Sequence, residues 1–125
     1  MSSTYLGNLA SLKDPRTFFV AEPAAALVAS GKLPNSYDAF AGAGAGEDLA
    51  TMSKNAGDGK YSFINRKRYY QTYTAETTTQ VGYQELCFNM AEAAHRGWIT
   101  GQSAETWYQN GIKASQAFYG IKEGA

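Results

Sequence analysis

The chain has 125 residues, enough for one domain with a hydrophobic core. Its 11 basic and 11 acidic side chains cancel, so it lacks the basic excess typical of nucleic-acid or anionic-membrane binding. The single cysteine, Cys87, excludes an internal disulfide framework and a cysteine-rich zinc site. We therefore expect no metal site, no cofactor and no nucleic-acid partner, and no apolar run reaches the about 18 residues that span a bilayer.

Residues 1–30 predict a short helix followed by extended segments. The apolar positions of this helix are Leu6, Leu9 and Ala10. The Asp14-Pro15 pair ends it, because a residue before proline is pushed out of the helical region. The apolar, aromatic or β-branched run at 17–20 favours a short extended stretch. The run at 24–29 is too short to distinguish helix from strand.

Residues 31–60 contain "AFAGAGAGEDLATMSKNAGDGK" and predict a long glycine-rich surface loop. Such a composition buries too little apolar surface to offset the cost of ordering the backbone. The glycines at 42, 44 and 46 have the spacing G-x-G-x-G, whereas a dinucleotide-binding turn has G-x-G-x-x-G between a strand and a helix. We therefore interpret the run as a loop and not as a nucleotide site.

Residues 61–82 predict an aromatic extended segment, which begins "YSFINRKRYYQTY". Two alternatives exist for its tyrosines. They can pack in the core or along a strand edge, which is the commoner role of such residues. They can also stack on sugar rings, whose C–H faces fit aromatic rings while hydroxyl groups form hydrogen bonds with polar neighbours.

Residues 83–120 predict a tetratricopeptide-like helical hairpin, with helices at about 83–96 and 103–119. Apolar residues of the first helix recur at i, i+3, i+4, i+7, i+8 and i+11, Gly97 suits its C-terminal cap, and Ser103 suits the N-cap of the second. Trp98 and Trp107 can cover the closed end. A single such unit, about 34 residues long, cannot bury its own apolar face, so we expect it to need packing partners.

No residue pattern predicts catalysis. His95 sits in the last turn of the first predicted helix, where a cation suits the helix dipole. Cys87 lies within the apolar stripe, where a small buried thiol is usual. Glu92 is best explained by a structural hydrogen bond, and no carboxylate pair faces across a gap as glycosidases require. We expect the protein not to be an enzyme.

The stretch "YQELCFNMAEAAHRGWITGQSAETWYQNGIKAS" resembles the signature hairpin of SusD/RagB-like proteins, in particular the second SusD-like subfamily of Bacteroidetes. Its matching motifs are "ELCF", "AEA", "RGW" and "GIKAS", and upstream "KDPR" and "FFVAEP" also resemble that subfamily. Members are much longer. The resemblance therefore implies that residues 1–125 are a partial SusD-like domain, mainly α, from the C-terminal half of a larger α-rich fold.

The resemblance implies a function as well. Such proteins are non-catalytic components of outer-membrane nutrient uptake complexes, which bind oligosaccharides or starch-like polysaccharides. The SusD-like proteins deliver these glycans to a TonB-dependent outer-membrane transporter. The resemblance also implies a surface-exposed protein at the outer membrane, attached only through a lipid anchor that this chain does not contain. The residues alone favour a different function, a helical-hairpin module for protein–protein interaction.

If the chain contacts sugar, we expect the contact between about 33 and 73 and not on the hairpin, because loops held on a rigid scaffold commonly carry binding. The candidate stacking residues are Tyr69, Tyr70 and Tyr73. Arg66 and Arg68 are candidate donors to sugar hydroxyls.

Overall fold

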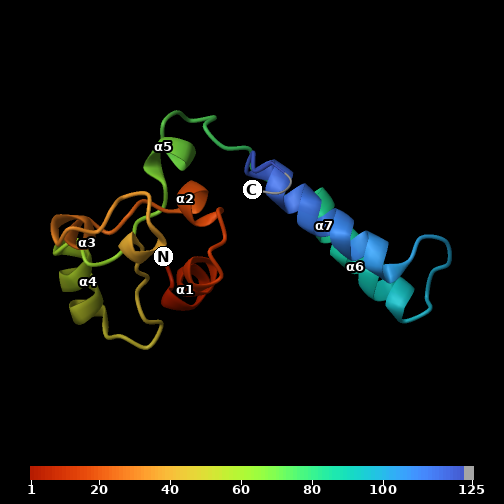
Figure 1. Ribbon diagram of the computed structural model, residues 1–125, viewed down its shortest axis with the longest axis horizontal. Helices are drawn as coiled ribbons and strands as arrows, with labels where there is room; N and C mark the ends of the chain where they lie inside the picture. Colours follow the sequence, from red (N-terminus) through yellow and green to blue (C-terminus); the bar gives the residue numbers. More distant parts are fainter. Residues whose placement is uncertain (123–125) are drawn as a thin grey trace. The chain divides into compact units, whose positions relative to one another are not determined.

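The computed structural model describes residues 1–122, which fall into two compact units, divided between Glu76 and Thr77. Every regular element in the described range is helical (Figure 1), which confirms the mainly α prediction. Residues 123–125 of the predicted domain lie outside the described range. The elements are α1 (Ser3–Ser11), α2 (Thr17–Val20), α3 (Ala25–Ala29), the 3-10 turn η1 (Tyr37–Ala39), α4 (Leu49–Gly57), α5 (Arg66–Tyr69), α6 (Tyr83–His95) and α7 (Ala104–Phe118).

The predicted short N-terminal helix is α1. The Ser2 hydroxyl accepts a hydrogen bond from the backbone N–H of Tyr5 at 3.1 Å, which caps the helix. Leu6 and Leu9 are buried on one side of it. Together with residues of α2, of η1 and of the segments between the helices, they form the core of the first unit, which comprises Leu6, Leu9, Thr17, Val20, Ala21, Ala24, Ala39 and Ser62.

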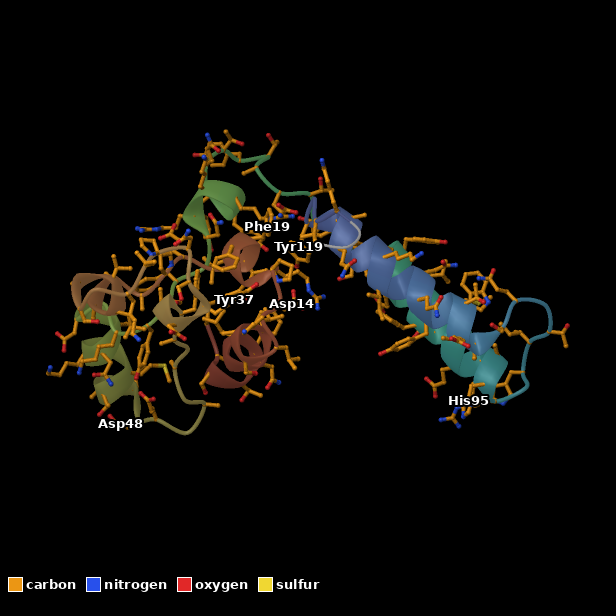
Figure 2. The ribbon with its side chains drawn as sticks, viewed as in Figure 1. Asp14, Phe19, Tyr37, Asp48, His95 and Tyr119 are labelled. Carbon is orange, nitrogen blue, oxygen red and sulfur yellow. The ribbon has the colours of Figure 1, made fainter. Side chains whose placement is uncertain are left out.

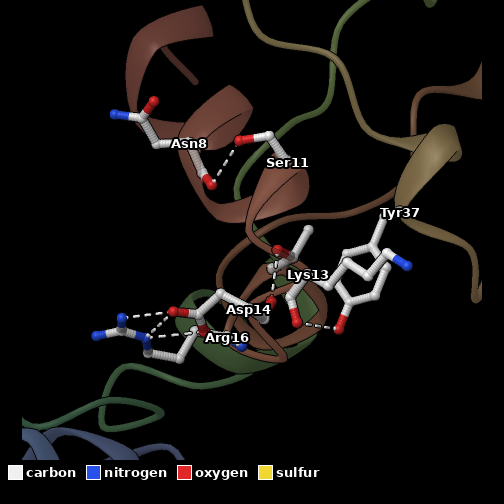
Figure 3. A network of polar contacts seen from close by, with 7 residues as sticks. Asn8, Ser11, Lys13, Asp14, Arg16 and Tyr37 are labelled. Atoms are coloured by element: carbon white, nitrogen blue, oxygen red, sulfur yellow. Dashed lines mark hydrogen bonds and ion pairs between the residues drawn. The ribbon is translucent and has the colours of Figure 1, made fainter.

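A polar corner connects α1 to α2 (Figure 3). The Asp14 carboxylate accepts hydrogen bonds from the Arg16 backbone N–H at 2.9 Å, from Nε at 3.0 Å and from Nη2 at 2.5 Å. The hydroxyl of Tyr37 donates to the Lys13 carbonyl at 2.7 Å and so ties η1 to the same corner. The side-chain hydrogen bonds from Arg16 hold the pKa of Asp14 below its ordinary value.

The expected extended stretch at 17–20 is wrong, because these residues form α2. The carbonyl of Asp14 accepts both the backbone N–H of Thr17 at 3.0 Å and its hydroxyl at 2.7 Å, which begins a helical turn. Thr17 and Val20 are both buried. The apolar character of this segment therefore reflects burial of one side of a short helix and not strand pairing.

The expected loop at 31–60 is also wrong in part, because it contains η1 and α4. Asp48 accepts a hydrogen bond from the backbone N–H of Thr51 at 2.9 Å and caps α4. Lys54 and Asp58 form an ion pair at 2.8 Å across one turn. No residue of α4 is fully buried, and Met52, Asn55 and Ala56 are half-buried on one side of it. Local capping and charge pairing therefore support a helix that packs only partly.

One glycine of the G-x-G-x-G run is explained by close packing. The N-terminal residues run beside it: the Ser3 N–H donates to Ala43 at 2.8 Å and the Ala43 N–H donates to Met1 at 2.9 Å. A Cβ atom on Gly42 would lie 2.4 Å from the backbone oxygen of Ser2. The run thus holds the N-terminus against the first unit.

The second unit is the predicted hairpin, with α6 and α7 side by side along their length (Figure 1). Ser103 accepts a hydrogen bond from Thr106 N–H at 3.2 Å, and Gly97 has φ of 71°, so both predicted boundary residues are confirmed. The buried seam contains Cys87, Ala91 and Gly111. Small residues at the seam allow the two helices to approach closely.

The expectation that Trp98 covers the closed end of the hairpin is wrong, since 71% of this side chain's surface is exposed. The guanidinium carbon of Arg96 lies 5.1 Å from its ring centroid, in a cation–π contact. The hairpin also leaves large apolar side chains exposed. Its exposed large apolar side chains include Leu86, Phe88, Tyr108, Ile112 and Phe118.

Candidate ligand-binding site around helix α5

Helix α5 is fixed to α2 by contacts between residues far apart in the chain. The backbone N–H of Glu22 donates to the Phe63 carbonyl at 2.8 Å, and that of Asn65 donates to Val20 at 3.0 Å. Asn65 also accepts from the Arg68 N–H at 3.2 Å and caps α5. The prediction of an extended segment over the whole of 61–82 is therefore wrong, because these contacts and the Asn65 cap begin a helical turn.

Arg66 is held by Glu22 through a two-pronged contact. The backbone N–H of Arg66 lies 2.9 Å from Glu22 Oε1, and its Nη2 lies 2.7 Å from Oε2. The side-chain hydrogen bonds lower the pKa of Glu22 and raise the pKa of Arg66. The side chain of Arg66 remains 72% exposed. Arg66 mainly connects α5 to Glu22. The outer edge of its guanidinium group faces solvent.

Arg68 and Glu76 close the loop that follows α5. Arg68 Nε lies 2.8 Å from one carboxylate oxygen of Glu76, and Nη2 donates to the other at 3.0 Å. Both side chains are about four-fifths buried, at 18% and 21% exposure. The guanidinium carbon of Arg68 also lies 5.7 Å from the ring centroid of Tyr69. The ion pair thus fixes the two ends of the loop that carries the predicted tyrosines.

The three predicted tyrosines line one cavity of about 470 Å³, together with Gln71 and Thr72. Tyr70 is 70% exposed and the side chain of Tyr73 is completely exposed, whereas Tyr69 is half-buried. Within the described residues, neither Tyr70 nor Tyr73 is packed into a core. Their rings are presented to solvent on a loop whose ends are fixed, which suits stacking on a ligand.

Tyr61 has a different role from the other tyrosines of its segment. Its hydroxyl donates a hydrogen bond to the carboxylate of Glu47 and accepts one from Asn55 Nδ2 at 2.9 Å. The bond to Glu47 raises the pKa of Tyr61 and lowers the pKa of Glu47. Glu47 in turn accepts the Gly44 N–H at 3.0 Å. Tyr61 thus fastens the glycine-rich segment and does not belong to the candidate site.

A second cavity, of about 420 Å³, shares Gln71 with the tyrosine cavity. It is lined by Phe18, Phe19, Asn65, Lys67, Arg68 and Gln71. Sequence reasoning predicted Arg68 but missed the phenylalanines, Lys67 and Gln71. The adjacent "FF" was the only signal, and an aromatic pair in an apolar run more often indicates core.

The residues considered for catalysis or metal binding do not form a centre. His95 lies at the end of α6, exposed to solvent (Figure 2), and Cys87 is completely buried, as predicted. Within residues 1–122, no three or more side chains of histidine, cysteine, aspartate or glutamate are grouped to hold a metal ion. In the same range, no helix combines the length and the apolar character needed to cross a membrane.

The chain matches known proteins along nearly its whole length. Residues 1–124 match the SusD-like family described as "starch-binding associating with outer membrane". A SusD homologue from Bacteroides fragilis superposes with a TM-score of 0.84 at 30% identity, covering 100% of this chain and 26% of the homologue. No curated protein matches the chain significantly.

Two further solved structures are similar. A putative outer-membrane protein from Bacteroides vulgatus, titled as probably involved in nutrient binding, gives a TM-score of 0.81 at 36% identity, covering 94% of this chain and 25% of its own. A second Bacteroides fragilis SusD homologue gives 0.74 at 30% identity, with 94% and 25% covered. The chain thus spans about a quarter of the length of these relatives. Family match and fold agree with the hairpin motifs, and the chain belongs to the SusD-like family.

Proposed function

We propose that the protein is a non-catalytic glycan-binding component of an outer-membrane nutrient uptake complex. Its ligand is an oligosaccharide or a starch-like polysaccharide, and its partner is a TonB-dependent transporter at the cell surface. The description of the family and the nutrient-binding relative support this proposal. We place the sugar contact of this chain at the loop after α5 and not on the hairpin.

The observation that carries this placement is the exposure of Tyr70 and Tyr73 at one cavity on a fastened loop. Large exposed aromatic rings cost free energy in water, and a sugar face recovers part of that cost by covering them. The Arg68–Glu76 pair keeps the loop closed before the ligand arrives, which lowers the entropic cost of binding.

The binding should be weak for each sugar unit. A sugar hydroxyl that binds a donor such as the outer edge of Arg66 must first lose its hydrogen bonds to water. Stacking on one ring contributes on the order of 1 kcal/mol, so each tyrosine should affect affinity about fivefold. A polysaccharide that covers several tyrosine rings at once binds more tightly, because the stacking contributions of the rings combine.

The experiment compares Tyr70→Ala and Tyr73→Ala with Trp98→Ala, by calorimetry with malto-oligosaccharides and a panel of other glycans. Trp98 is a matched control because it is an aromatic residue of the hairpin with 71% exposure. We expect the two tyrosine variants to lose about fivefold in affinity each and the tryptophan variant to retain it. Unchanged affinity in both tyrosine variants would show that the sugar contact lies elsewhere.

A second function, protein–protein interaction through the hairpin, is favoured by the exposed apolar side chains of α6 and α7. A cavity of about 610 Å³ on this unit is lined by Phe88, Ala91, Tyr108 and neighbouring polar residues. The rings of Phe88 and Tyr108 lie 5.5 Å apart, and 55% of Tyr108 is exposed. Replacement Tyr108→Ser should weaken association with a protein partner and leave glycan affinity unchanged if this face is an interaction surface.

A further inference from the structure

The second cavity near α5 has an unbalanced charge. Three cations follow one another in α5, and two of them, Lys67 and Arg68, line the cavity. Arg66 is paired with Glu22 and Arg68 with Glu76. Lys67, between them, has no hydrogen-bond or ion-pair partner among residues 1–122, and its side chain is exposed. Lys67 lines the cavity, so one uncompensated positive charge lies at its edge.

The remaining lining of this cavity is apolar or neutral, and none of its lining residues is acidic. Phe18 is held in place by the rings of Tyr37 and Phe40, at centroid distances of 4.7 and 5.3 Å. Phe19 is half-buried beside it in the chain. The phenylalanines therefore offer a rigid apolar surface, against which the face of a sugar ring can pack.

The polar side chains of the cavity differ in how many hydrogen bonds they already form within the protein. Asn65 uses its amide oxygen on Arg68 N–H and its amide nitrogen on the Phe18 carbonyl, at 3.2 and 3.5 Å. Gln71 has no such partner within the described residues and is exposed. Lys67 and Gln71 thus supply a cation and an unoccupied amide at the edge of an apolar surface.

We propose that this cavity binds an anionic sugar unit, one that carries a carboxylate or a sulfate group, while the tyrosine cavity stacks on the neighbouring unit. This inference rests on the proposed glycan-binding function and specifies its ligand class. Gln71 borders both cavities, so adjacent units of one chain can occupy them. Lys67 pairs with the anionic group, and Gln71 forms a hydrogen bond with a hydroxyl.

The size of the effect follows from the exposure of Lys67. An exposed ion pair contributes roughly two- to fivefold in affinity, and salt screens it because the Debye length is about 10 Å at 0.1 M. A neutral sugar gains nothing from the charge. The preference for an anionic over a neutral glycan should therefore be modest, dependent on Lys67 and sensitive to salt.

The experiment measures the affinity of the intact protein for three oligosaccharides of equal length: a malto-oligosaccharide, an oligogalacturonate and a sulfated galactan. The variants are Lys67→Gln and Lys67→Glu. Lys32→Gln is the matched control, since Lys32 belongs to the same unit, lines neither cavity and makes only a 3.8 Å ion pair with Asp38. It makes the same change in net charge as Lys67→Gln.

We expect at least one anionic oligosaccharide to bind about two- to fivefold more tightly than the neutral one. Lys67→Gln should remove this preference, Lys67→Glu should reverse it, and Lys32→Gln should retain it. Comparison of the oligogalacturonate with the sulfated galactan shows whether the site prefers a carboxylate or a sulfate group. Raising the salt concentration to 1 M should remove the preference in the unchanged protein.

Two outcomes separate this inference from the proposed function. If the neutral glucan binds through Tyr70 as tightly as both anionic oligosaccharides, the anionic preference is overturned while the glycan-binding proposal stands. If no glycan in the panel binds, both are overturned. A preference that Lys32→Gln weakens as much as Lys67→Gln would reflect net charge alone and would also overturn the inference.

Discussion

Arg68 and Glu76 form an ion pair that closes the loop carrying Tyr69, Tyr70 and Tyr73. The partners are eight positions apart in the chain, and both side chains are mostly removed from water. An ion pair in such a position is less screened than one on the open surface. It therefore fixes the two ends of the segment on which Tyr70 and Tyr73 lie.

Replacement Glu76→Gln should loosen this loop without unfolding the first unit. The neutral amide loses the charge attraction to Arg68, which contributes about 1 kcal/mol or less for a pair that still reaches solvent. Amide hydrogen exchange of residues 69–76 should become faster, and glycan affinity should fall by roughly the same free energy. The control Glu85→Gln, in α6, makes the same change of charge and should alter neither the exchange rates nor the glycan affinity. Unchanged exchange in Glu76→Gln would contradict the proposal that the Arg68–Glu76 pair holds the loop.

The glycine at position 42 is required by packing, whereas the one at 46 is not. A Cβ atom at Gly42 would lie 2.4 Å from a backbone oxygen of Ser2, while nothing lies within 4 Å of the corresponding atom at Gly46. Gly42→Ala should thus lower the free energy of unfolding by about 2 kcal/mol. Gly46→Ala should be neutral or slightly stabilising, because it restricts the unfolded chain. Equal effects in urea unfolding would show that the N-terminus does not pack here.

Gly111 and Phe88 should be coupled across the hairpin. A Cβ atom at Gly111 would lie 2.8 Å from the ring of Phe88, so Gly111→Ala must displace that ring. The same replacement gains up to about 1 kcal/mol of helix propensity. We expect Gly111→Ala to destabilise the unchanged protein by about 1 kcal/mol but to stabilise the Phe88→Ala variant. A double-mutant cycle on unfolding measures the coupling, and additive effects would contradict the contact.

The hairpin could be predicted from sequence because its signals are local. The apolar stripe of α6 follows the helical period, and Gly97 and Ser103 carry the capping chemistry of their own positions. What could not be predicted was exposure. The stripe indicates which side of each helix is apolar, but it does not indicate that Trp98, in the connection between the helices, and Tyr108 are 71% and 55% exposed.

The first unit was predicted less well because long-range contacts fix it. The Glu22–Arg66 pair joins residues 44 positions apart, and the Tyr37–Lys13 hydrogen bond joins residues 24 apart. No local pattern indicates such partners. The same reason applies to the site: the tyrosines are consecutive or nearly so and could be named, whereas Phe18 reaches the second cavity only through the fold.

The corner at Asp14 should make stability depend on pH in the acid range. Because side-chain hydrogen bonds from Arg16 lower the pKa of Asp14 in the folded protein, the unfolded state takes up the proton first as the pH falls. The stabilisation is therefore complete above the unfolded pKa, which is about 3.9, and is lost as the pH falls through the lower folded value.

Replacement Asp14→Asn tests this directly. At pH 6 the variant lacks the charge-assisted hydrogen bonds to Arg16 and should unfold more easily by about 1 kcal/mol, the low end for a group still in contact with water. As the pH falls below about 3.9, the unchanged protein loses this advantage because its carboxylate becomes protonated. The two urea-unfolding free energies should then converge. Other carboxylates, including Glu22 and Glu47, also have lowered pKa values, but they act equally in both proteins, so a constant difference across this range would contradict the role of Asp14.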